Sequence, residues 1–208
     1  IIMERQEAIR RLNEIIGQEL HILANQYNVT IYNNQGRVNK GWAGHVFERH
    51  LELPINSAQS PNFGSWELKS IPLKTLRNGN LRVKETMAIT MIGPINVMQK
   101  EFEESHLLSK LKKAVIVART VGNNVDEPSY IHSIIQFDLS PNGDLYNTIK
   151  NDYDLVRNIL LNDPQNGFNQ LSGRLGILIQ PRTKGQGNGS ISRAFYARIP
   201  FLNSLLNL

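Results

Sequence analysis

The stretch that decides the fold is a short run centred on one acidic and one basic side chain, Pro61-Asn62-Phe63-Gly64-Ser65-Trp66-Glu67-Leu68-Lys69. We predict a strand over residues 63–73, in which successive side chains point to opposite faces. Glu67 and Lys69 then point to one side, whereas Trp66, Leu68 and Ile71 lie on or near the other. The stretch therefore predicts a half-buried strand that presents a carboxylate and an ammonium group on one face.

The Glu67–Lys69 pair has two interpretations. A carboxylate and an ammonium group two residues apart can hold a divalent metal and a water next to each other, as metal-assisted phosphodiester hydrolysis requires. The same spacing also describes a surface ion pair on an ordinary half-buried strand. The pair alone does not distinguish these interpretations, so other features of the sequence are needed.

Length and composition narrow the class of protein. The 208 residues suit one domain, and 40% hydrophobic with 20% charged residues allow a buried core. The chain has no cysteine, which excludes disulfides and thiolate zinc sites and fits a reducing cytoplasm. No apolar run approaches the roughly 20 residues of a membrane span, so we expect a cytoplasmic protein without a membrane partner. The net charge of +5 is compatible with nucleic acid as a partner.

Hydrophobic periodicity and turn residues predict a mixed order of helices and strands. The predicted helices cover residues 3–28, 40–51, 144–161 and 201–206. The predicted strands cover residues 63–73, 85–92, 114–118, 131–139, 175–179 and 193–200. Strands 63–73 and 85–92 form a hairpin around the turn Asn78-Gly79. This order predicts a mixed α/β or α+β domain, residues 1–208, with a central sheet.

Three further features each have a structural and a functional interpretation. Glu48 is either a solvated helix charge or a carboxylate aimed at the Glu67 strand. The basic connection at residues 74–84 is either a solvated loop or an arm that contacts phosphates. The segment 180–190 is either a mobile surface loop or a DNA-reading loop, in which arginine and lysine suit guanine edges and glutamine and asparagine suit adenine edges.

Five motifs in register resemble one family of nucleases. They are Lys40-Gly41-Trp42-Ala43-Gly44 with Glu48, Glu67-Leu68-Lys69-Ser70-Ile71-Pro72, Glu104-Ser105-His106 with Lys110-Leu111-Lys112-Lys113, Ile179-Gln180-Pro181-Arg182, and Ala194-Phe195-Tyr196-Ala197-Arg198 with Phe201-Leu202-Asn203-Ser204-Leu205-Leu206. The set resembles the MutH mismatch-repair nicking endonucleases and the related type II restriction enzymes. The segments 74–85 and 183–185 look closer to the branch of restriction enzymes that cut GATC.

The resemblance implies a restriction-endonuclease-like fold, a mixed sheet flanked by helices around a DNA-binding cleft, and Mg²⁺-dependent hydrolysis of DNA. It implies that Glu67 binds the metal together with residue 62 and the Leu68 carbonyl, and that Lys69 orients the attacking water. Glu48 matches a supporting helix glutamate, and Lys110 matches a lysine near the scissile phosphate. The implied DNA-contacting residues are Gln180, Arg182, Thr183, Lys184, Tyr196, Lys112 and Lys113.

Asn62 departs from the family pattern, which has an aspartate ahead of the Glu-x-Lys motif. Magnesium favours carboxylate oxygen, so an asparagine weakens metal binding and slows cleavage. Three explanations compete: an engineered Asp-to-Asn replacement, a natural inactive DNA-binding domain, or compensation by another carboxylate such as Glu48. We favour the replacement, because the other active-site positions are intact. A second departure is Gln180, where the repair branch has an arginine.

The sequence thus predicts a type II restriction endonuclease in a form inactivated at Asn62, with Mg²⁺ as cofactor. The expected partner is double-stranded DNA with a short specific site, bound by a monomer or a homodimer. The alternatives are a non-catalytic DNA-binding domain and a mismatch-repair nicking endonuclease. Within the single domain we expect an N-terminal helix at about 3–28, a catalytic region at about 40–120 and a recognition region at about 174–200.

Overall fold

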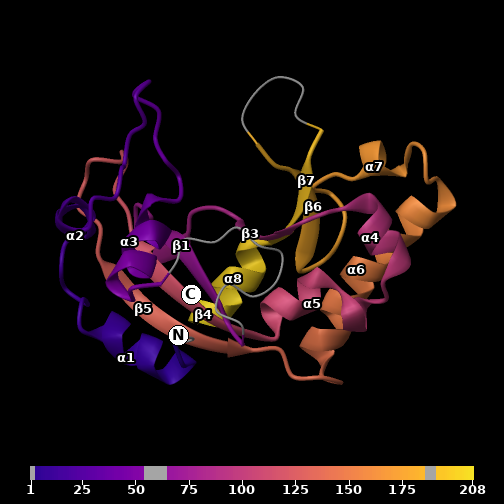
Figure 1. Cartoon of the computed structure of the whole chain (residues 1–208), viewed down its shortest axis with the longest axis horizontal. Coiled ribbons are helices and arrows are strands. Elements are labelled where there is room, and N and C mark those ends of the chain that lie inside the picture. The colour runs from indigo at the N-terminus through magenta and orange to yellow at the C-terminus, as the bar shows by residue number, and fades with distance from the viewer. Residues whose placement is uncertain (1–2, 54–64, 186–190) are drawn as a thin grey trace.

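The computed structural model describes residues 3–53, 65–185 and 191–208 (Figure 1). Its helices are α1 (Arg5–Asn13), α2 (Leu20–Gln26), α3 (Trp42–His50), α4 (Pro94–Gln99), the 3₁₀ helix η1 (Phe102–Glu104), α5 (His106–Leu111), α6 (Asp144–Asn162), α7 (Gly167–Gln170) and α8 (Ile199–Leu206). Its strands are β1 (Glu67–Thr75), β2 (Leu81–Val83), β3 (Met87–Met91), β4 (Lys113–Thr120), β5 (Ile131–Asp138), β6 (Ile179–Thr183) and β7 (Arg193–Ala197).

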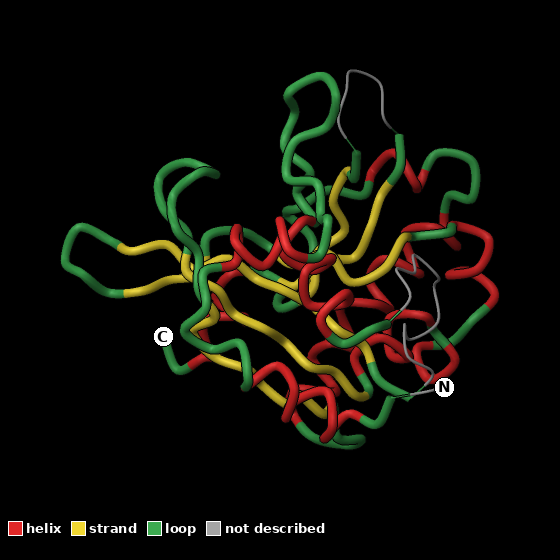
Figure 2. The backbone as a smooth tube through the Cα atoms, turned by 60° about the vertical axis from the view of Figure 1, so that its left-hand side comes forward, coloured by secondary structure: helices red, strands yellow, loops and turns green. Residues whose placement is uncertain are grey.

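The strands form a larger mixed sheet and a smaller antiparallel one. The larger sheet has the order β2-β1-β4-β5, with β1 parallel to β4 and the outer strands antiparallel to their neighbours. The smaller sheet has the order β3-β7-β6. Figure 2 shows the strands running between helices. The predicted mixed α+β fold with a helix-flanked sheet is confirmed, and the second sheet was not predicted.

Strand β1 lies between two hydrophobic cores, which explains its alternating sequence. Leu68 packs with α1, α2 and α3 on one face of the sheet. Ile71 and Leu73 pack on the other face, toward α5, α6, α8 and the smaller sheet. Glu67 and Lys69 have the same strand parity as Ile71, so the prediction that Ile71 lies opposite them is wrong. Burial on both faces, worth about 1.5–3 kcal/mol for each large apolar side chain, fixes the position of the Glu67–Lys69 pair.

Three predicted elements have other boundaries in the structure. The single helix over 3–28 is two helices, because the chain turns at Gly17, whose φ of +86° favours glycine. The hairpin partner of β1 is the short strand β2. Strand β3, which was the predicted partner, pairs with β7 in the smaller sheet. The strand expected at 175–179 begins at Ile179, because Gly176 at φ +80° turns the chain just before it.

Candidate active site

Glu67 lies at the start of β1 and is held by two lysines. Its side chain is 1% exposed, and Lys110 donates to both carboxylate oxygens at 3.1 and 3.0 Å. Lys69 Nζ lies 3.1 Å from Glu67 Oε1 and also donates to the Ile89 carbonyl of β3. Burial lowers the pKa of Lys110, and the Glu67 charge partly offsets this effect. A buried carboxylate therefore lies between two ammonium groups.

The Glu48 side chain of α3 interacts electrostatically with Glu67 and Lys69. The residue is 9% exposed, and its Oε2 is buried without a hydrogen-bond partner among the residues that the structure describes. Burial, reinforced by the charge of Glu67, raises the pKa of Glu48 to about 7. The interpretation of Glu48 as a solvated helix charge is therefore wrong, because the side chain is desolvated and interacts electrostatically with Glu67 and Lys69.

The two glutamates fit a divalent cation. Two neighbouring carboxylates, one with an oxygen that accepts no hydrogen bond from a described residue, supply hard oxygen ligands and repel each other until a cation lies between them. Within residues 3–53, 65–185 and 191–208, histidines and acidic residues form no cluster of three or more at metal-binding distance. Asn62, the remaining predicted ligand, lies outside the described residues, as do positions 186–190 of the predicted recognition loop.

A cleft of about 720 Å³ connects Lys69 with the predicted recognition strand. Its lining combines the start of α3, β1, β3, β6 and β7, and it includes Lys69, Arg182, Thr183, Lys184 and Tyr196. Desolvation and repulsion by Lys69 lower the pKa of Lys184, and the charge of Lys184 also acts on Lys110. Lys184, predicted only as a DNA contact, thus belongs electrostatically to the lysine group at the catalytic site.

The recognition strands present Arg182 and Tyr196 together. Arg182 Cζ lies 5.6 Å from the centre of the Tyr196 ring, and its Nη1 donates to Thr86 Oγ1 at 2.8 Å. Sequence reasoning missed Thr86, although its position at the start of the predicted strand 85–92, beside the basic 74–84 connection, was a possible signal. Gln180 pairs with Tyr196 in the sheet and is only 5% exposed, so its predicted base contact is not presented on the surface.

Two other predicted DNA contacts lie apart from this cleft. Lys112, directly after α5, and Lys113, the first residue of β4, are exposed and line a different hollow together with Glu103, Glu104 and Ser105. Leu68 is 7% exposed, and its side chain belongs to the helix-covered core. The structure therefore brings together Glu48, Glu67, Lys69, Lys110 and Lys184. Of this group, Lys69 and Lys184 line one cleft with Arg182 and Tyr196.

Comparisons with known proteins agree with this geometry. The family model for the DNA mismatch repair enzyme MutH matches residues 51–152, the span that carries Glu67, Lys69 and Lys110. The chain is 27% identical to the DNA mismatch repair protein MutH of Haemophilus ducreyi, over 96% of this chain and 92% of the relative. It is 26% identical to MutH of Vibrio vulnificus, over 91% and 80%. It is also 24% identical to the type II restriction enzyme Sau3AI of Staphylococcus aureus, over 95% of this chain but 39% of that enzyme.

A helix-flanked mixed sheet with a buried Glu67, paired with Lys69 at the edge of a cleft, is typical of the restriction-endonuclease-like class of proteins. Within that class, the chain is similar to the MutH-like endonuclease family. No helix in the described part of the chain has the length and apolar character needed to cross a bilayer.

Proposed function

We propose that this chain is a Mg²⁺-dependent endonuclease that hydrolyses phosphodiester bonds at a short specific site in double-stranded DNA. The observation that carries the proposal is the buried Glu67 carboxylate, held between Lys69 and Lys110, at a cleft that also contains Arg182 and Tyr196. The proposal divides the chain into a catalytic region at about 40–120 and a recognition region at about 174–200, within one domain.

The mechanism assigns separate tasks to the side chains of the site. Bound Mg²⁺ would supply Lewis-acid polarisation of the scissile phosphate and a water of lowered pKa. Glu67 and Glu48, with residue 62 and the Leu68 carbonyl, would hold that ion. Lys69 is placed to orient the attacking water, and its ammonium group stabilises negative charge that develops on the phosphoryl oxygens. Lys110 keeps the Glu67 carboxylate fixed and adds positive charge beside the phosphate.

DNA recognition in this proposal combines backbone and base contacts. Exposed cations of the 74–84 arm, with Lys112 and Lys113, position the backbone, and Arg182, Thr183, Lys184 and Tyr196 face the bases. Arg182 is suited to guanine because its fork of donors matches the O6 and N7 acceptors. Its contact with Thr86 holds that fork in the cleft before DNA arrives.

Asn62 decides whether the chain cuts DNA as it stands. We propose that Asn62 replaces a metal-binding aspartate and inactivates a type II restriction endonuclease. The test is plasmid cleavage with Mg²⁺ by this chain and by its Asn62→Asp version, side by side. Discrete double-strand fragments from only the Asn62→Asp protein support the proposal, and their ends give the recognition site.

The same assay separates the alternative functions. Nicked circles instead of linear fragments would assign the chain to the mismatch-repair type of activity that its MutH relatives' names indicate. Retardation of specific DNA without cleavage by either protein would make the chain a binding domain and overturn the catalytic roles of Glu67 and Lys69. Lys69→Ala on the Asn62→Asp background is the control, because it should abolish cutting while leaving DNA binding nearly intact.

A further inference from the structure

A second cavity opens beside the cleft and contains a cation that the proposed chemistry does not use. The cavity has a volume of about 280 Å³ and shares Lys40, Pro72 and Glu85 with the cleft lining. Arg119, near the end of β4, is partly buried in its wall. The cavity is therefore a side pocket of the cleft, which we name the Arg119 pocket.

The Arg119 guanidinium is held in place by aromatic and polar neighbours. Its Cζ lies 5.0 Å from the centre of the Trp42 ring, and its Nη1 donates to Ser129 Oγ at 3.1 Å. The His21 ring also lies 4.7 Å from the Trp42 ring. The cation–π contact and the hydrogen bond to Ser129 together restrain the guanidinium, which makes its remaining N–H donors directional.

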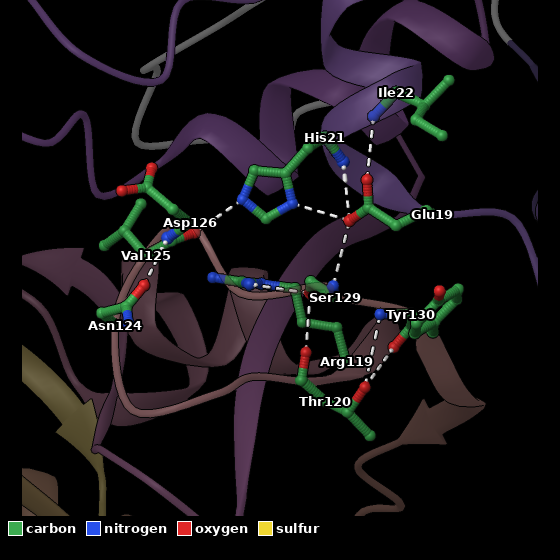
Figure 3. Close-up of polar contacts among 10 residues, drawn as sticks. All are labelled: Glu19, His21, Ile22, Arg119, Thr120, Asn124, Val125, Asp126, Ser129 and Tyr130. Carbon is green, nitrogen blue, oxygen red and sulfur yellow. Dashed lines mark hydrogen bonds and ion pairs between the residues drawn. The ribbon is translucent and has the colours of Figure 1, made fainter.

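The loop that closes the pocket is fixed as well (Figure 3). Glu19 accepts from the Ser129 amide at 3.0 Å, and the His21 ring bridges Glu19 and the Val125 carbonyl, with both contacts at 2.6 Å. Ser129 Oγ in turn donates to the Thr120 carbonyl at 2.6 Å. The pocket wall is therefore preorganised by contacts among α2, β4 and the loop before β5.

The charge of Arg119 is not neutralised by the described residues. Among residues 3–53, 65–185 and 191–208, none places a carboxylate within 4.0 Å of its guanidinium. Glu85 attracts Arg119 from a greater distance, and burial lowers the pKa of Arg119 to about 10 despite that attraction. Glu127, the other carboxylate in the lining, is occupied by its own loop, because it accepts from the Asn123 amide and from Asn124 Nδ2.

We propose that the Arg119 pocket binds a phosphate oxyanion, and that this phosphate belongs to the backbone of the DNA lying in the adjoining cleft. A desolvated guanidinium with unfilled donors binds phosphate oxygens through charge-assisted hydrogen bonds. Lys40 and Lys84, both exposed on the lining, add positive charge at the same place. This inference rests on the proposed function only for the source of the phosphate.

The test measures how duplex binding depends on salt. Affinities of the full chain for a mixed-sequence duplex are measured in EDTA between about 50 and about 200 mM salt, where each phosphate contact contributes about 0.9 to the slope of log K against log salt. Arg119→Met should weaken binding about tenfold at the low-salt end and reduce the slope by about one. The matched control is Arg10→Met, which removes the same charge from exposed α1 and should leave the slope unchanged.

A second variant tests the Arg119 pocket with the guanidinium in place, and the double variant then measures its coupling to Arg119. Glu85 is exposed, so Glu85→Gln should fold normally, and it removes the carboxylate that competes with phosphate for Arg119. We expect tighter duplex binding by Glu85→Gln, and we expect part of that gain to disappear when Arg119→Met is added. A gain of the same size with and without Arg119 would overturn the site.

Inorganic phosphate separates the pocket from the proposed function. Calorimetric titration with inorganic phosphate should show binding to the unaltered chain and none to Arg119→Met. If phosphate binds in this way while the duplex slope is unaffected by Arg119→Met, the DNA source is wrong. If the unaltered chain binds phosphate but no duplex, the proposed function fails and the DNA source fails with it. If phosphate binding does not depend on Arg119, the pocket itself is refuted.

Discussion

At the scale of single residues, the candidate active site depends on a buried charge that its neighbours must balance. The Lys110 side chain is 4% exposed and the Glu67 side chain is 1% exposed. Lys110 Nζ donates to both carboxylate oxygens of Glu67. We expect Lys110→Met to lower the free energy of unfolding by about 3 kcal/mol, because removing one partner leaves a buried charge poorly compensated. Urea denaturation measures the loss.

The matched control for this prediction is the exposed neighbour Lys112. Lys112→Met should change the free energy of unfolding by less than about 0.5 kcal/mol, as is usual for surface substitutions. Glu67→Gln combined with Lys110→Met should recover part of the loss, since no unpaired charge is then buried. Equal urea midpoints for the two single lysine variants would show that the Lys110–Glu67 contact is not stabilising.

The raised pKa of Glu48 predicts an unusual pH dependence of the free energy of unfolding. Its folded pKa of about 7 lies above its ordinary value of 4.5, so its contribution favours the folded state below about pH 4.5 and is lost as the pH rises through 7. Relative to Glu48→Gln, which stays neutral, the unaltered chain should lose about 3 kcal/mol between pH 4.5 and 8 in EDTA, at 1.36 kcal/mol per pKa unit. Thermal denaturation across this range checks the difference, and a gap that is constant with pH would contradict it.

At the scale of elements, one buried carboxylate positions the recognition strand. Asp152 of α6 is 4% exposed and accepts from the amides of Ile177, Leu178 and Ile179 at 2.7, 2.7 and 2.8 Å. These contacts hold the chain at the entry to β6, which carries Arg182. Because Asp152→Ala leaves three amides without their acceptor, we expect a loss of about 3 kcal/mol in the free energy of unfolding and weaker DNA binding.

Asp154, two residues along the same helix, provides the comparison. It is 34% exposed and pairs with Lys150 at 3.4 Å on the surface. Asp154→Ala should cost less than about 1 kcal/mol and leave DNA binding unchanged. Equal losses of stability in the two variants, measured by urea denaturation, would mean that the entry to β6 does not depend on Asp152.

Some elements and side-chain environments are predictable from the sequence, and others are not. The strand at Glu67 and the helix at Glu48 are predictable because local periodicity agrees with their burial. The partner of β3 is not predictable from the adjacent turn, since β3 pairs with β7, more than a hundred residues away. Arg119 carries no local signal, because its environment is created by Trp42 and Ser129 from distant segments. Asn62 lies outside the described residues, so its role stays a prediction.

At the scale of the whole molecule, both hydrophobic cores are built on the same sheet. Leu12 of α1 belongs to the core on one face, and Leu202 of α8 belongs to the core on the other, with both fully buried. Because β1 and β4 contribute side chains to both cores, neither core is complete when the other unfolds. We therefore expect one cooperative transition for the described part of the chain.

The two tryptophans make this prediction testable, because Trp42 and Trp66 both belong to the core that contains Leu12. Leu202→Ala, in the opposite core, should destabilise the chain by about 2–5 kcal/mol. Its urea midpoint should move equally by tryptophan fluorescence and by far-ultraviolet circular dichroism, and Leu12→Ala should behave in the same way. If Leu202→Ala shifts the urea midpoint measured by circular dichroism but not the one measured by tryptophan fluorescence, the two faces of the sheet unfold separately. In that case the cleft residues of β6 and β7 would be able to move independently of Glu67.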